Sequence, residues 1–310
     1  MAQKSTGFFY KLSIQDAFEE FLDAKTAAGC SQGTIEAYRS HMYSSISKYL
    51  DLEMDVADLT SEILTRMVAR MARTNLSRNS IRSYTATMAS FCGWMRKEGL
   101  CDAKIALFKG KETVPSTYSM NDLKKLLERP KTKCFAEYRN WVIVNLLVNN
   151  GLRAASVRSL EIQDVDLENK MIRLRHTKSG RAQVVPMSPV LADILKVYMK
   201  RLRGRPTDLL FPAKDGGKMS ENCLRNAIRR YNTQRGVKLT SIHAFRHTFA
   251  RIYLVDCQGN ALKLQRLLGH RTLDMTKRYV KIFDADLVQD FQDKSPLAAI
   301  KKAPRRTARS

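Results

Sequence analysis

Apolar side chains recur at intervals of three and four residues through most of the first hundred positions of this 310-residue chain. That interval places them on one face of an α-helix and disfavours the strict alternation of a half-buried strand. From Ser13, which can cap a helix, an apolar face that includes Phe18 and Phe21 runs to Gly29, where the helix is expected to end. The same spacing predicts further helices over residues 34–50, 60–72 and 77–97. Residues 1–108 are therefore predicted to form a helical bundle.

The segment from Phe108 to Ser119 breaks this pattern, because it is polar, contains Gly and Pro, and has no apolar period. It predicts a linker at residues 109–118 between two domains. Directly after it, Ser119 is followed three residues later by Asp122, an acidic variant of the capping box that opens a helix. Residues 119–295 are predicted to form the second domain, and residues 296–310 a basic C-terminal tail.

The second domain contains a predicted β-hairpin. Residues 171–177 and 182–187 carry β-branched and alternating apolar side chains on either side of a Lys-Ser-Gly turn at 178–180. Helices are predicted around it, over residues 120–129, 135–149, 189–203, 220–236, 243–257, 261–268 and 284–291. The expected fold class of the chain is mainly α with a small antiparallel β-sheet, and the second domain is mixed α+β.

The chain is strongly basic: 54 Lys and Arg residues stand against 30 Asp and Glu residues, a formal net charge of +24 at pH 7. Such an excess favours a polyanionic partner, and nucleic acid is the expected one. The candidate DNA-binding residues lie on the later helices of the first domain and after the predicted turn. They are Arg66, Arg70, Arg73, Arg78, Arg82 and Arg181. The alternative, a charged face that only meets solvent, stays open for these arginines.

Several classes of protein are disfavoured by features that the sequence lacks. The N-terminal residues have no long apolar region of a signal peptide, and the longest apolar run, residues 141–148, is far shorter than a membrane span. The six cysteines form no CxxC pair, and no His cluster has zinc-ligand spacing. We therefore expect a cytoplasmic, nucleoid-associated bacterial protein with reduced thiols and with no membrane partner, metal or cofactor.

Five short segments together carry the residue types needed to transfer a phosphoryl group to a side-chain hydroxyl. They are NNGLRAAS with Arg153, RHTKSGRAQ with Lys178, HAFRHTFA with His243 and Arg246, LLGH with His270, and KRYV with Tyr279. Two guanidiniums can hold the nonbridging oxygens of a phosphodiester. A lysine can give a proton to the departing 5′-oxygen, and a tyrosine can attack phosphorus. Taken singly, each residue has an ordinary structural explanation, such as surface exposure or packing.

The two histidines complete this predicted catalytic set. His243 and His270 can donate to the phosphate or orient its neighbours, and one of them is expected to help manage the tyrosine proton. The scheme stores the energy of the broken bond in a phosphotyrosine, so it needs neither ATP nor a metal ion. In agreement, the sequence has no cluster of Asp and Glu of the kind that two-metal nucleases use.

The run HAFRHTFA, followed by LQRLLGHRTLDMTKRYV, resembles the tyrosine recombinases, which include phage and transposon integrases and Xer-type recombinases. The resemblance covers Ser119 to Phe291 specifically and the N-terminal helices less specifically. It implies that residues 1–108 are a SAM-like core-binding domain and that residues 119–295 are the catalytic domain. The catalytic set that it implies is Arg153, Lys178, His243, Arg246, His270 and Tyr279.

The same resemblance implies how the chain acts. Its partners would be double-stranded DNA core sites and three further copies of itself in a synaptic homotetramer. A C-terminal segment would dock on the neighbouring protomer, although packing on its own domain is an equal alternative. A mobile genetic element is the expected substrate. The alternatives are an Xer-like recombinase that resolves dimers, a type IB topoisomerase-like enzyme, and a catalytically idle DNA-binding protein.

Some positions depart from the family pattern or leave a choice within it. Ser156 stands where the family often has an acidic residue, so support for Arg153 is expected to come from elsewhere. Phe245 replaces a commoner Leu, which predicts a change in packing. Arg181 competes with Lys178 for the role of proton donor. Lys178 is preferred, because it precedes the turn and loses a proton more readily than an arginine.

Overall fold

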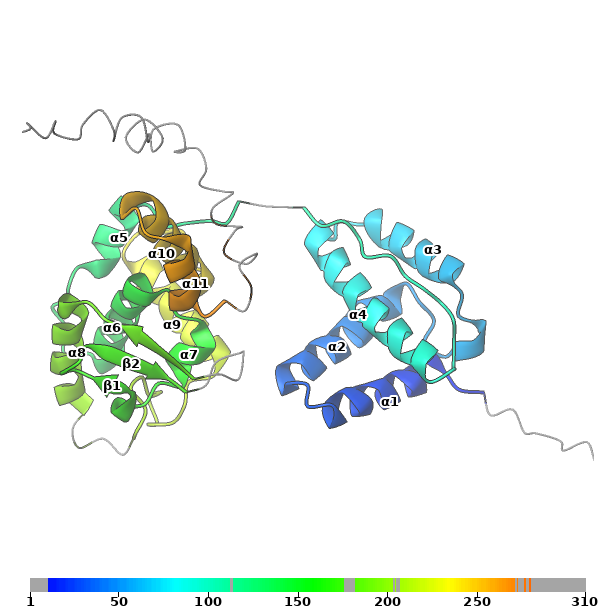
Figure 1. Cartoon of the computed structure of the whole chain (residues 1–310), viewed down its shortest axis with the longest axis horizontal. Coiled ribbons are helices and arrows are strands. Elements are labelled where there is room, and N and C mark those ends of the chain that lie inside the picture. The colour runs from blue at the N-terminus through cyan, green and yellow to red at the C-terminus, as the bar shows by residue number, and fades with distance from the viewer. Residues whose placement is uncertain are drawn as a thin grey trace, which may run out of the picture. The chain divides into compact units, whose positions relative to one another are not determined.

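The computed structural model of the chain describes residues 11–111, 114–175, 182–202, 204, 207–270, 272, 276 and 279. It divides into two compact units, Met1–Thr113 and Val114–Ser310, and each is described by itself (Figure 1). The boundary between the units falls in the segment predicted as a linker. Among the described residues, no helix combines the length and the apolar character required to cross a lipid bilayer.

The first unit is a helical bundle. Its helices are α1 (Ile14–Ala27), α2 (Gln32–Ser44), α3 (Ser61–Ala72) and α4 (Arg78–Lys97). The predicted cap of α1 is present, because the Ser13 hydroxyl accepts a hydrogen bond from the backbone N–H of Asp16 at 3.0 Å. In the core, the fully buried rings of Phe18, Phe21 and Phe91 have centroids 5.2 to 5.5 Å apart. These apolar faces hold the helices together.

The second helix of this unit is shorter than predicted. The apolar spacing predicts it to residue 50, but α2 ends at Ser44, and Ile46–Lys48 form a separate 3₁₀ turn. Between them, Ser45 leaves helical backbone geometry at φ −131° and ψ −56°. Ile46 and Leu50 are nevertheless buried in the core, as the apolar spacing predicts.

The second unit combines seven helices and a three-stranded sheet in the part of the chain that the structure describes. The helices are α5 (Met120–Leu127), α6 (Phe135–Asn150), α7 (Ala154–Arg158), α8 (Pro189–Leu202), α9 (Glu221–Gln234), α10 (Ile242–Arg251) and α11 (Ala261–Leu268). The predicted capping box of α5 is present between Ser119 and Asp122. The helix predicted over residues 284–291 lies outside the described residues.

The sheet contains the predicted hairpin and one unpredicted strand. Strands β2 (Met171–Leu174) and β3 (Gln183–Pro186) pair antiparallel, which confirms the two arms of the hairpin, whereas its turn lies outside the described residues. Strand β1 (Val165–Asp166) adds to the free edge of β2, in the order β1-β2-β3. With only two residues, β1 is too short to show alternation in the sequence.

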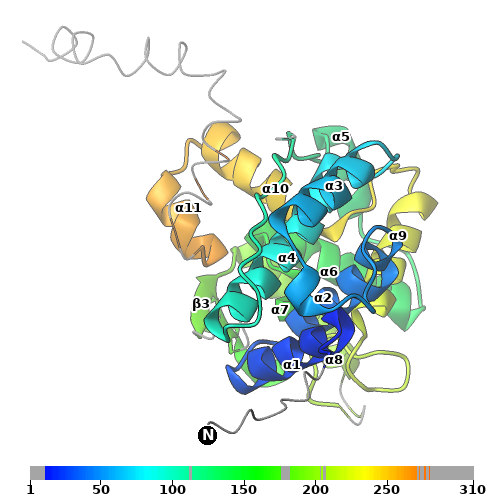
Figure 2. The same ribbon diagram turned by 90° about the vertical axis from the view of Figure 1, so that its right-hand side faces the viewer.

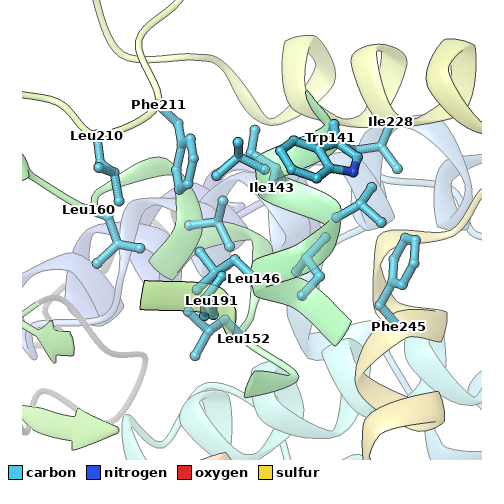
Figure 3. Packing of buried hydrophobic residues seen from close by; sticks show 14 of the residues in the cluster. Trp141, Ile143, Leu146, Leu152, Leu160, Leu191, Leu210, Phe211, Ile228 and Phe245 are labelled. Carbon is cyan, nitrogen blue, oxygen red and sulfur yellow. The ribbon is translucent and has the colours of Figure 1, made fainter. Parts of the chain in front are cut away.

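Helix α6 forms the centre of the second unit. Its apolar residues are buried on nearly every side, which is typical of a helix at the core of a domain. Figure 3 shows Trp141, Ile143 and Leu146 of α6 surrounded by apolar side chains from other elements, among them Phe211 and Phe245. Because α6 is enclosed in this way, the residues that follow its C-terminus are held on a rigid support.

Helix α10 packs against α6, and a small buried apolar cluster joins it to α11, which is drawn in orange in Figures 1 and 2. The Phe245 ring is fully buried and stacks on Tyr118 at 4.1 Å. The backbone N–H of Tyr118 donates to the Thr248 hydroxyl at 2.8 Å, which fastens the next turn of α10 to the same segment. After Arg251 the helix continues as one π-helical turn, Ile252–Asp256, so the helix predicted over 243–257 changes type part-way.

Candidate active site

The two predicted catalytic arginines, Arg153 and Arg246, meet at the C-terminal end of α11. The Arg246 side chain donates to the Leu268 carbonyl at 2.8 Å and to the Gly151 carbonyl at 3.0 Å. Arg153, which precedes the short helix α7, donates to the same Leu268 carbonyl at 3.4 Å. A single backbone oxygen therefore holds both guanidiniums, although Arg153 and Arg246 are 93 positions apart in the chain.

The end of α11 suits this task because its last carbonyl groups have no partner within the helix and carry the negative end of the helix dipole. Gly269 turns the chain away at φ +62°, a backbone conformation that favours glycine. The Gln183 amide of β3 donates to the carbonyls of Arg266 and Leu267 at 2.6 and 3.0 Å. Gln183 was not predicted, and it ties the second strand of the hairpin to the helix end that holds the arginines.

The start of the arginine cluster depends on Gly151, which ends α6 at φ +58°. A β-carbon at this position would lie 2.7 Å from the Phe249 ring, so neither the backbone nor the space suits a side chain. With glycine, the chain turns sharply, the Gly151 carbonyl accepts from Arg246, and Arg153 follows two residues later. The departure at Ser156 also has its answer here, because the Leu268 carbonyl contacts the Arg153 guanidinium.

Burial shapes the electrostatics of this cluster. Arg246 is only 3% exposed, and burial, together with the neighbouring charge of Arg153, lowers its pKa to about 10. Burial also lowers the pKa of Arg153. The Tyr279 hydroxyl opposes this effect and raises the pKa of both arginines. Both guanidiniums still carry their charge at neutral pH. Two like charges held this close form a strongly positive site that an anion would stabilise.

His270 and Tyr279 lie in the same cluster. Both are largely buried, and their rings are parallel within 2° with centroids 6.0 Å apart. His270 Nδ1 forms a hydrogen bond of 2.8 Å with the Thr276 hydroxyl. Burial and the charges of Arg246 and Arg153 lower the pKa of His270 to about 4, so the imidazole is neutral at pH 7. The structure thus brings together Arg153, Arg246, His270 and Tyr279.

Of the remaining predicted catalytic residues, only His243 lies within the described part of the chain. Lys178 and the competing Arg181 lie outside the described residues. His243 is exposed near the start of α10 and lines a hollow of about 410 Å³ between α9 and α10. Its ring meets that of His247 edge-on, with centroids 4.6 Å apart.

His247 is the residue that the sequence interpretation missed. Its Nδ1 and the Tyr279 hydroxyl lie 3.0 Å apart in a hydrogen bond whose direction follows the imidazole tautomer. The proton of the tyrosine was expected to involve His243 or His270, and His247 adds a third imidazole, one that is hydrogen-bonded to the hydroxyl. One signal was available, because His247 follows Arg246 directly and lies one helical turn after His243.

Comparison with known proteins agrees with this arrangement. The model of the phage integrase family matches residues 117–286. The chain belongs to the phage integrase family. It is therefore a tyrosine recombinase, an enzyme that breaks and rejoins DNA strands.

Among relatives of this recombinase, tyrosine recombinase XerA of Saccharolobus solfataricus is 27% identical over 290 residues, which cover 89% of this chain and 91% of the relative. The integrase of transposon Tn1549, solved with transposon right-end DNA, aligns with a TM-score of 0.71 at 16% identity and covers 86% of this chain and 94% of its own. A lambda integrase, solved as a tetramer bound to a Holliday junction, aligns with a TM-score of 0.69 at 15% identity. The alignment covers 87% of this chain and 78% of the lambda integrase chain. Both likenesses show a shared fold.

The geometry around Gly151 predicts a specific loss of stability. Gly151→Ala is expected to lower the free energy of unfolding by about 2 to 4 kcal/mol, from a left-handed backbone cost plus overpacking against Phe249. Gly236→Ala is the matched control, because Gly236 has φ +68° but nothing lies within 4 Å of an added β-carbon. Urea denaturation followed by Trp141 fluorescence, in a Trp94→Phe background, measures both. Equal losses in the two variants would contradict the role of the Phe249 contact.

The lowered pKa of His270 predicts a pH-dependent stability. Between about pH 6.5 and pH 4 the unfolded chain binds a proton at this residue that the folded chain does not. Folding stability should therefore fall as the pH drops through that window, by up to about 3 kcal/mol from this group. His270→Asn removes the group, so the variant should lose less stability than the wild type between pH 7 and pH 4.5 in the same urea assay. Parallel losses would show that His270 is not buried as a neutral imidazole.

Proposed function

We propose that this recombinase is site-specific and joins DNA strands through a 3′-phosphotyrosine intermediate, with Tyr279 as the nucleophile. The observation that carries this proposal is the Leu268 carbonyl, which holds Arg153 and Arg246 together while Tyr279 lies against the same cluster. Each guanidinium has five N–H donors and uses only some of them here. The remaining donors suit the nonbridging oxygens of one phosphodiester.

The chemistry follows from this charge arrangement. The two guanidiniums stabilise the negative charge that develops on the phosphoryl oxygens, and their effect is large because the site is buried. The Tyr279 oxygen forms a bond to phosphorus, the bond from phosphorus to the 5′-oxygen breaks, and Lys178 supplies a proton to that oxygen. Neutral His270 donates a hydrogen bond near the phosphate. The reverse attack by a 5′-hydroxyl restores the strand, so no metal ion or nucleotide cofactor is required.

The first unit offers a second basic feature for the DNA backbone. A hollow of about 700 Å³ is lined by Arg78, Arg82, Lys109, Gly110 and Lys111. Arg78 lies over the Phe108 ring at 5.0 Å and donates to the Lys109 carbonyl at 3.0 Å, which holds the start of α4 against this segment. Four cations around one hollow form a site for DNA phosphates.

The other predicted DNA-binding arginines of this unit have partners of their own. Arg66 pairs with Glu62 at 3.4 Å, and Arg70 lies 5.8 Å from the Tyr49 ring centroid and donates to the Tyr49 carbonyl at 3.2 Å. Arg73 is exposed at the end of α3. We infer that Arg78 and Arg82 contribute most of the phosphate contact, and that Arg66, Arg70 and Arg73 add to it from the exposed face of α3.

The proposed assembly is a homotetramer on double-stranded core sites in the bacterial cytoplasm, with the C-terminal segment docked on a neighbouring protomer. The likeness to a lambda integrase tetramer bound to a Holliday junction supports this assembly. The proposed substrate is a mobile element, which the departures at Ser156 and Phe245 favour over a housekeeping role. Inverted repeats in the DNA beside the gene would support it.

An Xer-like role in resolving dimers is the second candidate, because XerA and XerC recombinases match this chain over about nine-tenths of its length. Recombination between two sites on one plasmid, compared with insertion of one site into another replicon, separates the two roles. Efficient relaxation of a supercoiled plasmid without any particular site would instead favour a topoisomerase.

The nucleophile is tested by trapping. Nicked duplexes with a randomised core release a short fragment on cleavage, so the strand cannot be rejoined. With these duplexes the wild-type protein should form a covalent adduct in excess EDTA. Tyr279→Phe removes only the hydroxyl and is expected to abolish the adduct while DNA binding stays within about threefold, because the phenyl ring still packs on His270. An adduct that survives in Tyr279→Phe would overturn the assignment, and strict dependence on Mg²⁺ would contradict the metal-independent scheme.

The basic hollow predicts the salt dependence of binding. With the duplexes that the wild-type protein captures, Arg82→Gln should weaken binding and reduce the slope of log affinity against log salt by about one. Arg39→Gln is the matched control, because Arg39 is an exposed arginine of the same unit that pairs with Glu19 at 2.8 Å. A fall in slope that is as large for Arg39→Gln as for Arg82→Gln would show a general charge effect instead of a site at the hollow.

A further inference from the structure

The hydroxyl of Tyr279 must lose its proton when it attacks phosphorus, and the proton needs an acceptor within hydrogen-bond reach. A phenol has a pKa of about 10, so at neutral pH nearly all of it is protonated before the attack. A neutral imidazole is the usual acceptor, at a distance of about 2.6 to 3.2 Å between heavy atoms. The Nδ1 atom of His247 satisfies that distance, at 3.0 Å from the Tyr279 oxygen.

The position of His247 is fixed by the fold. It lies on α10 between Arg246, whose guanidinium is anchored on two carbonyls, and Thr248, whose hydroxyl accepts from the Tyr118 backbone and donates to the Ala244 carbonyl at 2.7 Å. Both neighbours are buried, whereas His247 itself is half-buried. The imidazole is therefore held on a rigid helix turn, which gives the precision that proton transfer needs.

The surrounding charges favour loss of the proton from Tyr279. Arg246 and Arg153 interact with the Tyr279 hydroxyl, so they stabilise the negative charge that appears on its oxygen as the proton leaves. The Nδ1 atom of His270 is engaged elsewhere, in a hydrogen bond of 2.8 Å with the Thr276 hydroxyl. The His243 ring meets the His247 ring edge-on, with the two centroids 4.6 Å apart.

We propose that His247 is a further catalytic residue, the general base that accepts the proton of Tyr279. This inference rests on the proposed function. In cleavage, the proton moves from the Tyr279 oxygen to Nδ1 of His247 while the oxygen–phosphorus bond forms, and the 5′-oxygen leaves with a proton from Lys178. In rejoining, the imidazolium returns the proton to the departing tyrosine oxygen. The role requires the tautomer with the hydrogen on Nε2, so that the hydroxyl donates to Nδ1.

Two substitutions separate a base from a positioning group. His247→Asn places an amide oxygen near the position of Nδ1, so it can still accept a hydrogen bond from the hydroxyl but cannot accept its proton. His247→Ala removes both properties and leaves space for a small base. Single-turnover adduct formation is measured on the duplexes captured by the wild-type protein, with DNA affinity and thermal unfolding recorded for each variant. His41→Asn is the matched control, because His41 lies in the first unit and bonds Thr87.

The base assignment predicts that both variants form adduct about 100-fold or more slowly, while affinity for DNA stays within about threefold. Added imidazole should raise the rate of adduct formation by His247→Ala at least tenfold and should leave the rate of the wild type unchanged. Adduct formation by His247→Asn within threefold of the wild type would overturn the proposal, as would two slow variants that imidazole does not rescue. Tyr279→Phe separates this failure from a failure of the proposed function. If the wild type forms adduct and Tyr279→Phe does not, the nucleophile stands whichever way His247 behaves.

Discussion

The carbonyl oxygen of Leu268 is the acceptor around which the proposed active site is built. Two guanidiniums would repel each other if they were brought together in a buried site without a negative partner. The end of α11 supplies that partner, since its last carbonyls carry partial negative charge and the carbonyl of Leu268 accepts from both arginines. Gly269 and Gln183 then keep the helix end where it is, one through its left-handed turn and the other through its amide.

The same dependence explains how distant segments converge. Arg153 follows the end of α6, Arg246 lies on α10, and the LLGH segment ends α11. The proposed phosphate site therefore requires three elements to pack correctly against one another. Helix α6, buried on nearly every side, is the common support, and the stacked rings of Tyr118 and Phe245 fix α10 against it. Phe245 therefore does more than fill space, because its ring anchors the turn that carries the adjacent Arg246.

Much of this could be predicted from the sequence, because it depends on local signals. The apolar spacing predicts α1, α3 and α4 nearly to the residue, and the arms of the hairpin follow from alternation. The motifs NNGLRAAS, HAFRHTFA, LLGH and KRYV predict that Arg153, Arg246, His270 and Tyr279 act together, and the structure places these four residues in one cluster. Gln183 and the Leu268 carbonyl could not be predicted, because each contact ends on a backbone carbonyl. Gln183 reaches carbonyls 83 and 84 positions away, and the Leu268 carbonyl accepts from Arg153, 115 positions away. His247 was missed for a different reason, since its neighbours in HAFRHTFA already had roles.

The burial of Arg246 has a consequence for the balance between stability and activity. A guanidinium that is 3% exposed has lost its water during folding, so folding already bears the cost of dehydrating the cation before any DNA arrives. In the proposed reaction, a phosphate would meet a charge with little water left to displace, and its interaction would strengthen as negative charge grows on its oxygens. Folding would thus bear in advance a dehydration cost that the reaction would otherwise meet.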